Sequence, residues 1–287
     1  MRSKLVGKLG LLKDKKPTLP KATIYKGKDS NVNDVVIVTD AWGMRFARYP
    51  IDPESLEVVI EKDFYKPELL AMERLVKKGD TVIDIGANIG LFTVFLSKLV
   101  GPKGHLYAFE PILDTYWRMR ENLALNRCDN AAAYQQALSN KNGTATMNVF
   151  PEGYGAWNTF GTPKFGEIIA VSKESVPLIK LDSFAKRENL KKVDFLKIDV
   201  EGYEYDVLQG ARDMLANNRV KYLSFEISEI PLKGAGRKGE DIFNILKSHG
   251  YLAYEYDHKI NKFKGPIDTS DAYYQNFYAS RSDMTRI

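Results

Sequence analysis

The sequence is poor in the residues that several common sites and folds require. Among its 287 residues Cys128 is the only cysteine, which excludes an internal disulfide and a cysteine-based zinc site and favours a reducing compartment. No apolar run is long enough to cross a bilayer, and the first residues lack the apolar stretch of a signal peptide. These absences together predict a cytoplasmic protein.

The net charge of +5 is modest, and the excess of basic residues lies at the N-terminal end of the chain. Residues 1–28 contain eight lysines and Arg2 against the single acid Asp14. The remainder is slightly acidic, so no nucleic-acid partner is expected for the main body. Apolar residues recur at helical spacing between the first lysines, at positions 5, 6, 9 and 12. This pattern fits a basic amphipathic helix that contacts a membrane surface or a partner, although a solvated chain end has the same composition.

The stretch from Thr81 to Gly90, T-V-I-D-I-G-A-N-I-G, organises the chain. Its first five residues are mostly β-branched, as in a buried parallel strand, and residues 91–100 are apolar nearly all round, as in a buried helix. Glycine between them lets a ligand approach the backbone, and the start of the helix offers free N–H groups. Strand, glycine turn and helix in this order predict the first unit of a nucleotide-binding βαβ fold.

The residues around this turn favour one cofactor over another. The dinucleotide fingerprint is G-x-G-x-x-G, whereas this turn reads G-x-N-x-G. Asp84 precedes the first glycine, and Glu110 closes the next predicted strand, where a carboxylate can accept both hydroxyls of a ribose. A carboxylate at the turn suits a ligand with an ammonium group and repels a pyrophosphate. We therefore expect S-adenosylmethionine (SAM) rather than NAD.

The rest of the chain alternates between predicted strands and helices, which implies an α/β protein with a largely parallel sheet covered on both faces. We divide it into a basic N-terminal extension (1–33), a small β-hairpin and lead-in (34–66) and a cofactor-binding domain (67–287). Residues 151–166 are rich in glycine and aromatic side chains and predict a binding loop or a packed surface loop. Residues 231–239 (P-L-K-G-A-G-R-K-G) predict a mobile basic loop.

Four segments in order resemble the FkbM-type SAM-dependent methyltransferases, over about residues 67–230. They are the D-x-G-A-N-I-G turn, the F-E-P of residues 109–111 with Asn122 and Asn126 after it, the Leu181-Asp182 step, and K-I-D-V-E-G-x-E of residues 197–204. The resemblance implies a Rossmann-like class I fold, with a seven-stranded sheet whose last strand is antiparallel. It also implies methyl transfer to a hydroxyl of a sugar, glycan or other small molecule.

The same resemblance implies roles for individual residues. Gly86, Asn88 and Gly90 would line the methionine and ribose region of SAM, with Asp84 beneath it, and Glu110 would hold the ribose. Gln136 and Ala137, expected at the end of the third strand, would flank the adenine. Asp199 would lie at the tip of its strand, beside the sulfonium and the acceptor.

Methyl transfer to a hydroxyl is assisted by a base, and the carboxyl ends of the strands offer several acids. Asp199 is our first candidate and Glu201 the second, although Glu201 or Glu204 could instead cap the following helix. Asp199, Glu226 and Glu229 could alternatively bind a divalent cation such as Mg²⁺. The spacing is not diagnostic of such a site, and we predict no metal. His258 is an alternative base.

Two other functions remain open from the sequence alone. A nucleic-acid methyltransferase is disfavoured because Asp199 is followed by V-E-G rather than by the proline-rich tetrad of amino-methylating enzymes, but the lysine-rich N-terminus could bind RNA. A non-catalytic SAM-binding adaptor is disfavoured because the turn, Glu110 and Asp199 are all present. The acceptor and the oligomeric state cannot be derived from these patterns.

Overall fold

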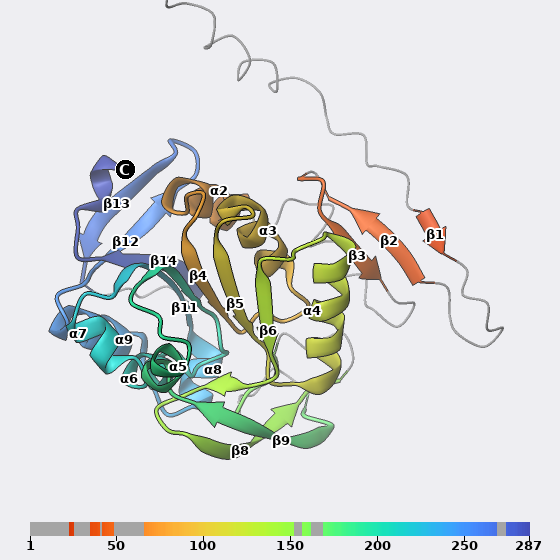
Figure 1. Ribbon diagram of the computed structural model, residues 1–287. Helices are drawn as coiled ribbons and strands as arrows, with labels where there is room; N and C mark the ends of the chain where they lie inside the picture. Colours follow the sequence, from red (N-terminus) through yellow and green to blue (C-terminus); the bar gives the residue numbers. More distant parts are fainter. Residues whose placement is uncertain are drawn as a thin grey trace, which may run out of the picture.

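A computed structural model describes residues 23–25, 35–40, 42–48, 66–151, 157–161, 169–268 and 274–287, with side chains left out at 23–25, 35–39 and 48. Its centre is an eight-stranded sheet in the order β13-β12-β14-β11-β10-β4-β5-β6 (Figure 1). The strands are β4 (Thr81–Ile85), β5 (His105–Phe109), β6 (Ala131–Tyr134), β10 (Val193–Ile198), β11 (Val220–Ser228), β12 (Leu252–Asp257), β13 (Lys262–Ile267) and β14 (Tyr274–Ser280).

The pairing of these strands is the predicted α/β arrangement with one strand more than expected. β6, β5, β4, β10 and β11 are parallel, and β14, the last strand of the chain, is antiparallel to β11. β14 also pairs with β12, and β13 adds the eighth strand at that edge. β10 is buried along its whole length, as expected for the middle of a sheet that is covered on both faces.

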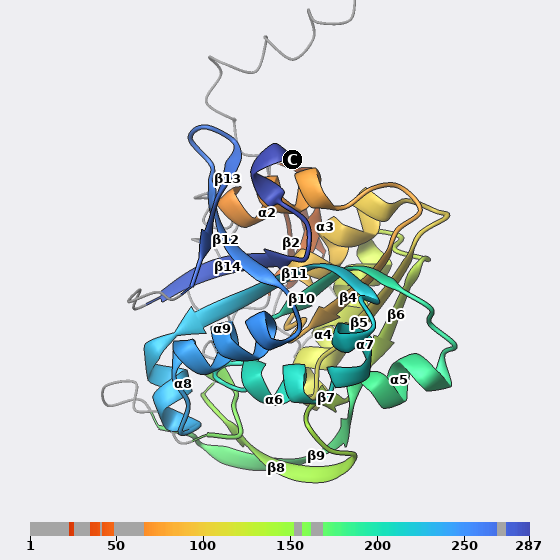
Figure 2. The same ribbon diagram turned by 90° about the vertical axis from the view of Figure 1, so that its left-hand side faces the viewer.

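Helices cover the sheet on both faces (Figures 1 and 2). On one face α2 (Lys66–Leu75), α3 (Leu91–Val100) and α4 (Leu113–Leu125) bury one apolar cluster against β4, β5 and β10. On the other face α5 (Leu181–Arg187), α6 (Glu204–Gln209), α7 (Arg212–Ala216) and α9 (Gly239–Ser248) bury a second cluster. In the described part of the chain, no helix is both long enough and apolar enough to span a bilayer.

Two smaller sheets accompany the main one. β8 (Gly143–Val149) pairs with β9 (Ser172–Ile179), which also pairs with the short β7 (Ala137–Leu138); both views show β8 and β9 beneath the main sheet. The predicted hairpin is present as β2 (Val35–Thr39) and β3 (Arg45–Arg48), with β1 (Thr23–Tyr25) beside β2.

Two asparagines of α4 hold this hairpin against the domain. Asn126 accepts a hydrogen bond from the Arg45 N–H (2.9 Å) and donates one to the Arg45 carbonyl (2.6 Å). Asn122 is fully buried; its oxygen accepts from the Ala47 N–H (2.9 Å) and its amide donates to the Ile89 carbonyl in the glycine turn (2.8 Å). Asn122 therefore ties the hairpin and the turn to one helix.

Three local predictions need correction or lie outside the description. Residues Glu229–Gly234 form helix α8, so the first four residues of the predicted basic loop 231–239 are helical and the loop proper is shorter than predicted. The predicted third strand is divided into β6 and β7, and the helix predicted over 203–217 is divided at Gly210, where a Cβ atom would lie 2.1 Å from the Ser139 carbonyl oxygen. The predicted basic helix at residues 1–12 and most of the loop 151–166 lie outside the described residues.

Candidate active site

The glycine turn packs directly against the end of β10. Gly86 has φ +78°, and a Cβ atom there would lie 1.7 Å from the carbonyl oxygen of Asp199. The N–H groups of Gly86 and Ala87 both donate to the Phe109 carbonyl, at 3.0 Å. Asn88 has φ +50° and Gly90, which begins α3, has φ +89°. Only glycine fits at position 86, because the ends of three neighbouring strands meet there.

Glu110 lies where β5 ends and binds this turn. It is buried and accepts hydrogen bonds from the N–H groups of Asn88 and Ile112, both at 3.0 Å. Burial nevertheless raises the pKa of Glu110 to about 7, since the two hydrogen bonds offset only part of the lost hydration. An acidic side chain held against a glycine turn in this way fits the predicted role of binding ribose hydroxyls.

Asp84 is fully buried beneath the turn, on β4. Its Oδ2 accepts a hydrogen bond from the Thr93 hydroxyl on α3 (2.6 Å), whereas its buried Oδ1 accepts none. Burial raises the pKa of Asp84, which the Lys197 ammonium at 3.8 Å counteracts in part. A buried carboxylate with one unsatisfied oxygen is suited to a cationic ligand.

Lys197 was not singled out from the sequence, although it lies at the centre of the site. It projects from β10 and contacts Asp199 Oδ2 (2.9 Å), Asp84 Oδ1 (3.8 Å) and the ring of Phe92 (4.6 Å to the centroid). A lysine in the middle of a buried apolar strand, two residues before an acid on the same face, was the signal that could have identified it.

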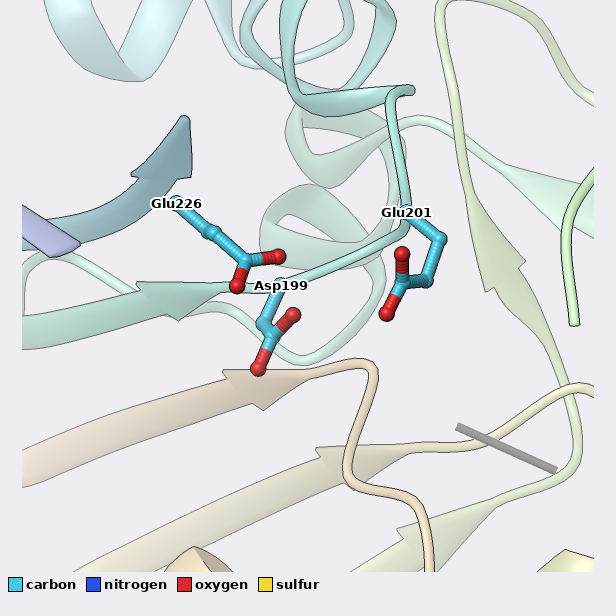
Figure 3. A group of neighbouring side chains, drawn as sticks. All are labelled: Asp199, Glu201 and Glu226. Atoms are coloured by element: carbon cyan, nitrogen blue, oxygen red, sulfur yellow. The ribbon is translucent and has the colours of Figure 1, made fainter. Parts of the chain in front are cut away.

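Asp199 and Glu201, which follow β10, bring their carboxyl groups close to that of Glu226 on β11. One oxygen of each lies within 4.8 Å of the others (Figure 3). Burial raises the pKa of Glu201 and Glu226 well above the usual range, and the neighbouring Asp199 raises both further. Glu201 has φ +51°, and its carbonyl accepts a hydrogen bond from the Thr159 hydroxyl (2.8 Å).

Glu204 and Glu229 have other roles. Glu204 caps the turn before α6, accepting from the N–H groups of Val200 (3.1 Å) and Gly202 (3.3 Å), so it is the structural member of the V-E-G-x-E motif. Glu229 forms an ion pair with Lys233 on α8 and is absent from the carboxylate group. The sequence suggested Asp199, Glu226 and Glu229 as possible ligands of a cation. In the structure the third carboxyl group of this set is that of Glu201, and Glu229 lies elsewhere.

The matching family model is the methyltransferase FkbM domain, over residues 84–253. The chain belongs to the FkbM methyltransferase family. The match begins at Asp84 and includes Glu110, Lys197, Asp199 and Glu226. It confirms the family expected from the sequence motifs.

Curated relatives of this FkbM-family chain carry names of methyltransferases. Methyltransferase 1 of Beauveria bassiana is 29% identical over 46% of this chain and 58% of its own length. The 2-O-methyltransferase NoeI of Sinorhizobium fredii is 30% identical over 54% and 68%, and the hexuronic acid methyltransferase AglP of Haloferax volcanii is 28% identical over 59% and 62%. The chain thus spans about three fifths of the length of the first two curated relatives.

Two residues from outside the matched range lie beside the candidate site. Glu68, near the start of α2, accepts a hydrogen bond from the Asn276 amide on β14 (3.0 Å), and Asn276 is the register partner of Glu226. Burial raises the pKa of Glu68, and its second oxygen has no hydrogen-bond partner. These two residues are 208 positions apart, so only the fold brings them to this edge.

The two predicted adenine neighbours lie away from the end of a main-sheet strand. β6 ends at Tyr134, Gln136 is half-buried after it, and Ala137 belongs to β7 of the small sheet. The Ala137 side chain is buried with Ile112, Met147, Val176 and Leu178. His105 opens β5 opposite Thr81, at the far edge from the turn, and His258 is exposed beyond β12.

Proposed function

We propose that this chain transfers a methyl group from SAM to a hydroxyl of a sugar, a glycan or another small molecule. The observation that carries the proposal is the contact between the glycine turn and Asp199. A potential base and a potential cofactor turn lie against each other at the carboxyl ends of the parallel strands, where α/β sheets bind ligands. The names of the relatives NoeI and AglP support a sugar-like acceptor.

The residues present fit SAM. Asp84, with its unsatisfied buried oxygen, would lie beneath the methionine part, which Gly86, Asn88 and Gly90 would line, and Glu110 would hold the ribose. Gln136 and Ala137 stay our candidates for the adenine side. When bound, SAM supplies an electrophilic methyl group on a positively charged sulfur.

The protein contributes alignment and a proton acceptor. Holding the acceptor oxygen in line with the methyl group supplies about 7–11 kcal/mol of the barrier reduction. Asp199 takes the hydroxyl proton as the new carbon–oxygen bond forms and the carbon–sulfur bond breaks with its electron pair leaving on sulfur. Glu201 is the second candidate for this step. General-base assistance of this kind contributes about 10²–10⁴-fold.

Isothermal titration of the full chain with SAM and S-adenosylhomocysteine, with NAD as the control, tests the cofactor. Micromolar binding of both adenosyl ligands without NAD binding supports the proposal. Absence of adenosyl binding contradicts it and would mean that the turn no longer binds a cofactor or needs a partner to do so. Transfer of a labelled methyl group to sugars, glycans and RNA, with and without a chelator, then tests the acceptor class and the alternative cation site at Asp199, Glu201 and Glu226.

A cytoplasmic location stays a prediction.

A further inference from the structure

Lys197 has an unusual environment for a lysine. Among the residues that the structure describes, it is the only lysine or arginine that is buried, at 5% exposure. Its stem follows β10 between apolar neighbours, and its ammonium lies beside the Phe92 ring of α3. Burying an ammonium group is costly unless it is paired, so its partners account for its presence there.

Those partners lie just after β10 and on the adjacent strand β4. Asp199, the first residue after β10, is at 2.9 Å, and Asp84, the register partner of Lys197 on β4, is at 3.8 Å. Burial lowers the pKa of Lys197, but the carboxylates of Asp199 and Asp84 outweigh it, with a further contribution from Glu226 on β11, and the net pKa is raised. The lysine therefore stays charged throughout the neutral range.

Among the described residues, no lysine or arginine forms an ion pair with the other acids at this edge. Glu201 and Glu226 face Asp199, and burial together with that carboxylate raises the pKa of both. Glu68 on α2 and Glu204 on α6 are two further acids here, and each has one oxygen without a hydrogen-bond partner in the described part of the chain. Lys197 forms its ion pairs with Asp84 and Asp199.

We propose that Lys197 is a positioning residue for methyl transfer, which holds the carboxyl groups of Asp84 and Asp199 in one arrangement. One ammonium would thereby link the residue beneath the cofactor turn to the candidate base. This inference rests on the proposed methyl transfer and adds the residue that fixes the position of its base.

The test compares Lys197→Met with Lys197→Arg and with Lys192→Met. Lys192, just before β10, is the matched control because it pairs with Asp194 at 2.8 Å at the other end of that strand. We measure kcat at saturating SAM and the affinity for S-adenosylhomocysteine. A misplaced catalytic group can cost about 10²-fold in rate, so Lys197→Met should lower kcat by about 10²-fold.

The arginine variant keeps the charge and is expected to recover most of the lost kcat, and Lys192→Met is expected to match the wild-type kcat. Wild-type kcat in Lys197→Met, or an arginine variant no better than the methionine variant, would overturn the inference. If the methionine variant does not fold, Lys197→Gln, which can still donate a hydrogen bond, should show a loss of kcat as well. Wild-type protein that binds no adenosyl ligand would instead contradict the proposed function.

Discussion

A lysine–aspartate pair lies at each end of strand β10, with the same spacing and nearly the same distance but with the burial reversed. Lys192 and Asp194 are 2.8 Å apart, with 70% of the Lys192 side chain and 7% of the Asp194 side chain exposed. Lys197 and Asp199 are 2.9 Å apart, with 6% of the Lys197 side chain and 31% of the Asp199 side chain exposed. Removing the partner of a buried charge is costly, so the buried charge that needs its partner is Asp194 in the first pair and Lys197 in the second.

The two ends of the sheet differ because parallel strands all end on the same side. At the amino end Asp194 is satisfied locally: it accepts from the Thr81 N–H (3.0 Å) and from Lys192. At the carboxyl end β4 and β10 lead into turns before helices, and in the described part of the chain buried oxygens of Asp84, Glu68 and Glu204 have no hydrogen-bond partner. Changes at the carboxyl end should therefore affect binding and turnover, and matched changes at the amino end only stability.

The largest expected effect is that of Gly86→Ala. The new Cβ would overlap the Asp199 carbonyl at 1.7 Å, and the left-handed backbone adds strain, so we expect a loss of at least about 3 kcal/mol in the free energy of unfolding and no SAM binding. Gly79→Ala is the control: it has φ +89° and no atom within 4 Å of the new Cβ, and should cost about 1–2 kcal/mol. Equal costs in urea unfolding would contradict the close approach of β10 to the turn.

Asp199→Asn should slow methyl transfer by about 10²–10⁴-fold at saturating SAM, because the amide accepts no proton. Binding of S-adenosylhomocysteine should persist. Asp194→Asn, the equivalent change at the other end of β10, should leave turnover within about threefold of the wild type. It should lower the free energy of unfolding by about 1–3 kcal/mol, because the two oxygens of buried Asp194 accept hydrogen bonds from the Thr81 N–H and from Lys192. Wild-type turnover by Asp199→Asn would remove this residue from the mechanism and leave Glu201.

Glu110→Ala should weaken SAM binding by about 10–100-fold, which corresponds to about 1.5–3 kcal/mol for hydrogen bonds to a charged group. Its loss also leaves the N–H groups of Asn88 and Ile112 without their acceptor. Glu174→Ala removes an acceptor of the Leu113 N–H (3.1 Å) from the same region and should change the affinity by less than about threefold. Titration calorimetry measures the SAM affinity of both variants. Unchanged SAM affinity in Glu110→Ala and also in Asp84→Ala would refute the proposed cofactor site.

The smallest expected effect is a change in how stability depends on pH. Burial raises the pKa of Glu204 to about 7, so the folded protein binds more protons than the unfolded chain between about pH 4.5 and 7. Stability therefore falls as the pH rises through that range, with about 1–3 kcal/mol from this group. Glu204→Gln should flatten the slope in urea titrations of the ligand-free protein, whereas Glu229→Gln should not. A steeper fall of stability with pH in Glu204→Gln would contradict the raised pKa of Glu204.

The sequence by itself determined the local structure around the cofactor turn. Its β-branched run, its glycines and the apolar stretch after them predict β4, the turn and α3, because such preferences act over a few residues. The acids that follow the strands, Glu110 and Asp199, could likewise be placed at one edge, since a parallel sheet brings all its carboxyl ends together.

Only the tertiary structure decided which of these groups meet. The register of β4 against β10 sets Lys197 beside Asp84, the antiparallel β14 brings Asn276 to Glu68 and Glu226, and α8 carries Glu229 away to Lys233. Likewise, the role of Asn122 and Asn126 became clear from the hairpin that they bind. Contacts of this kind depend on strand order and register, which join residues far apart in the chain and leave no local pattern in it.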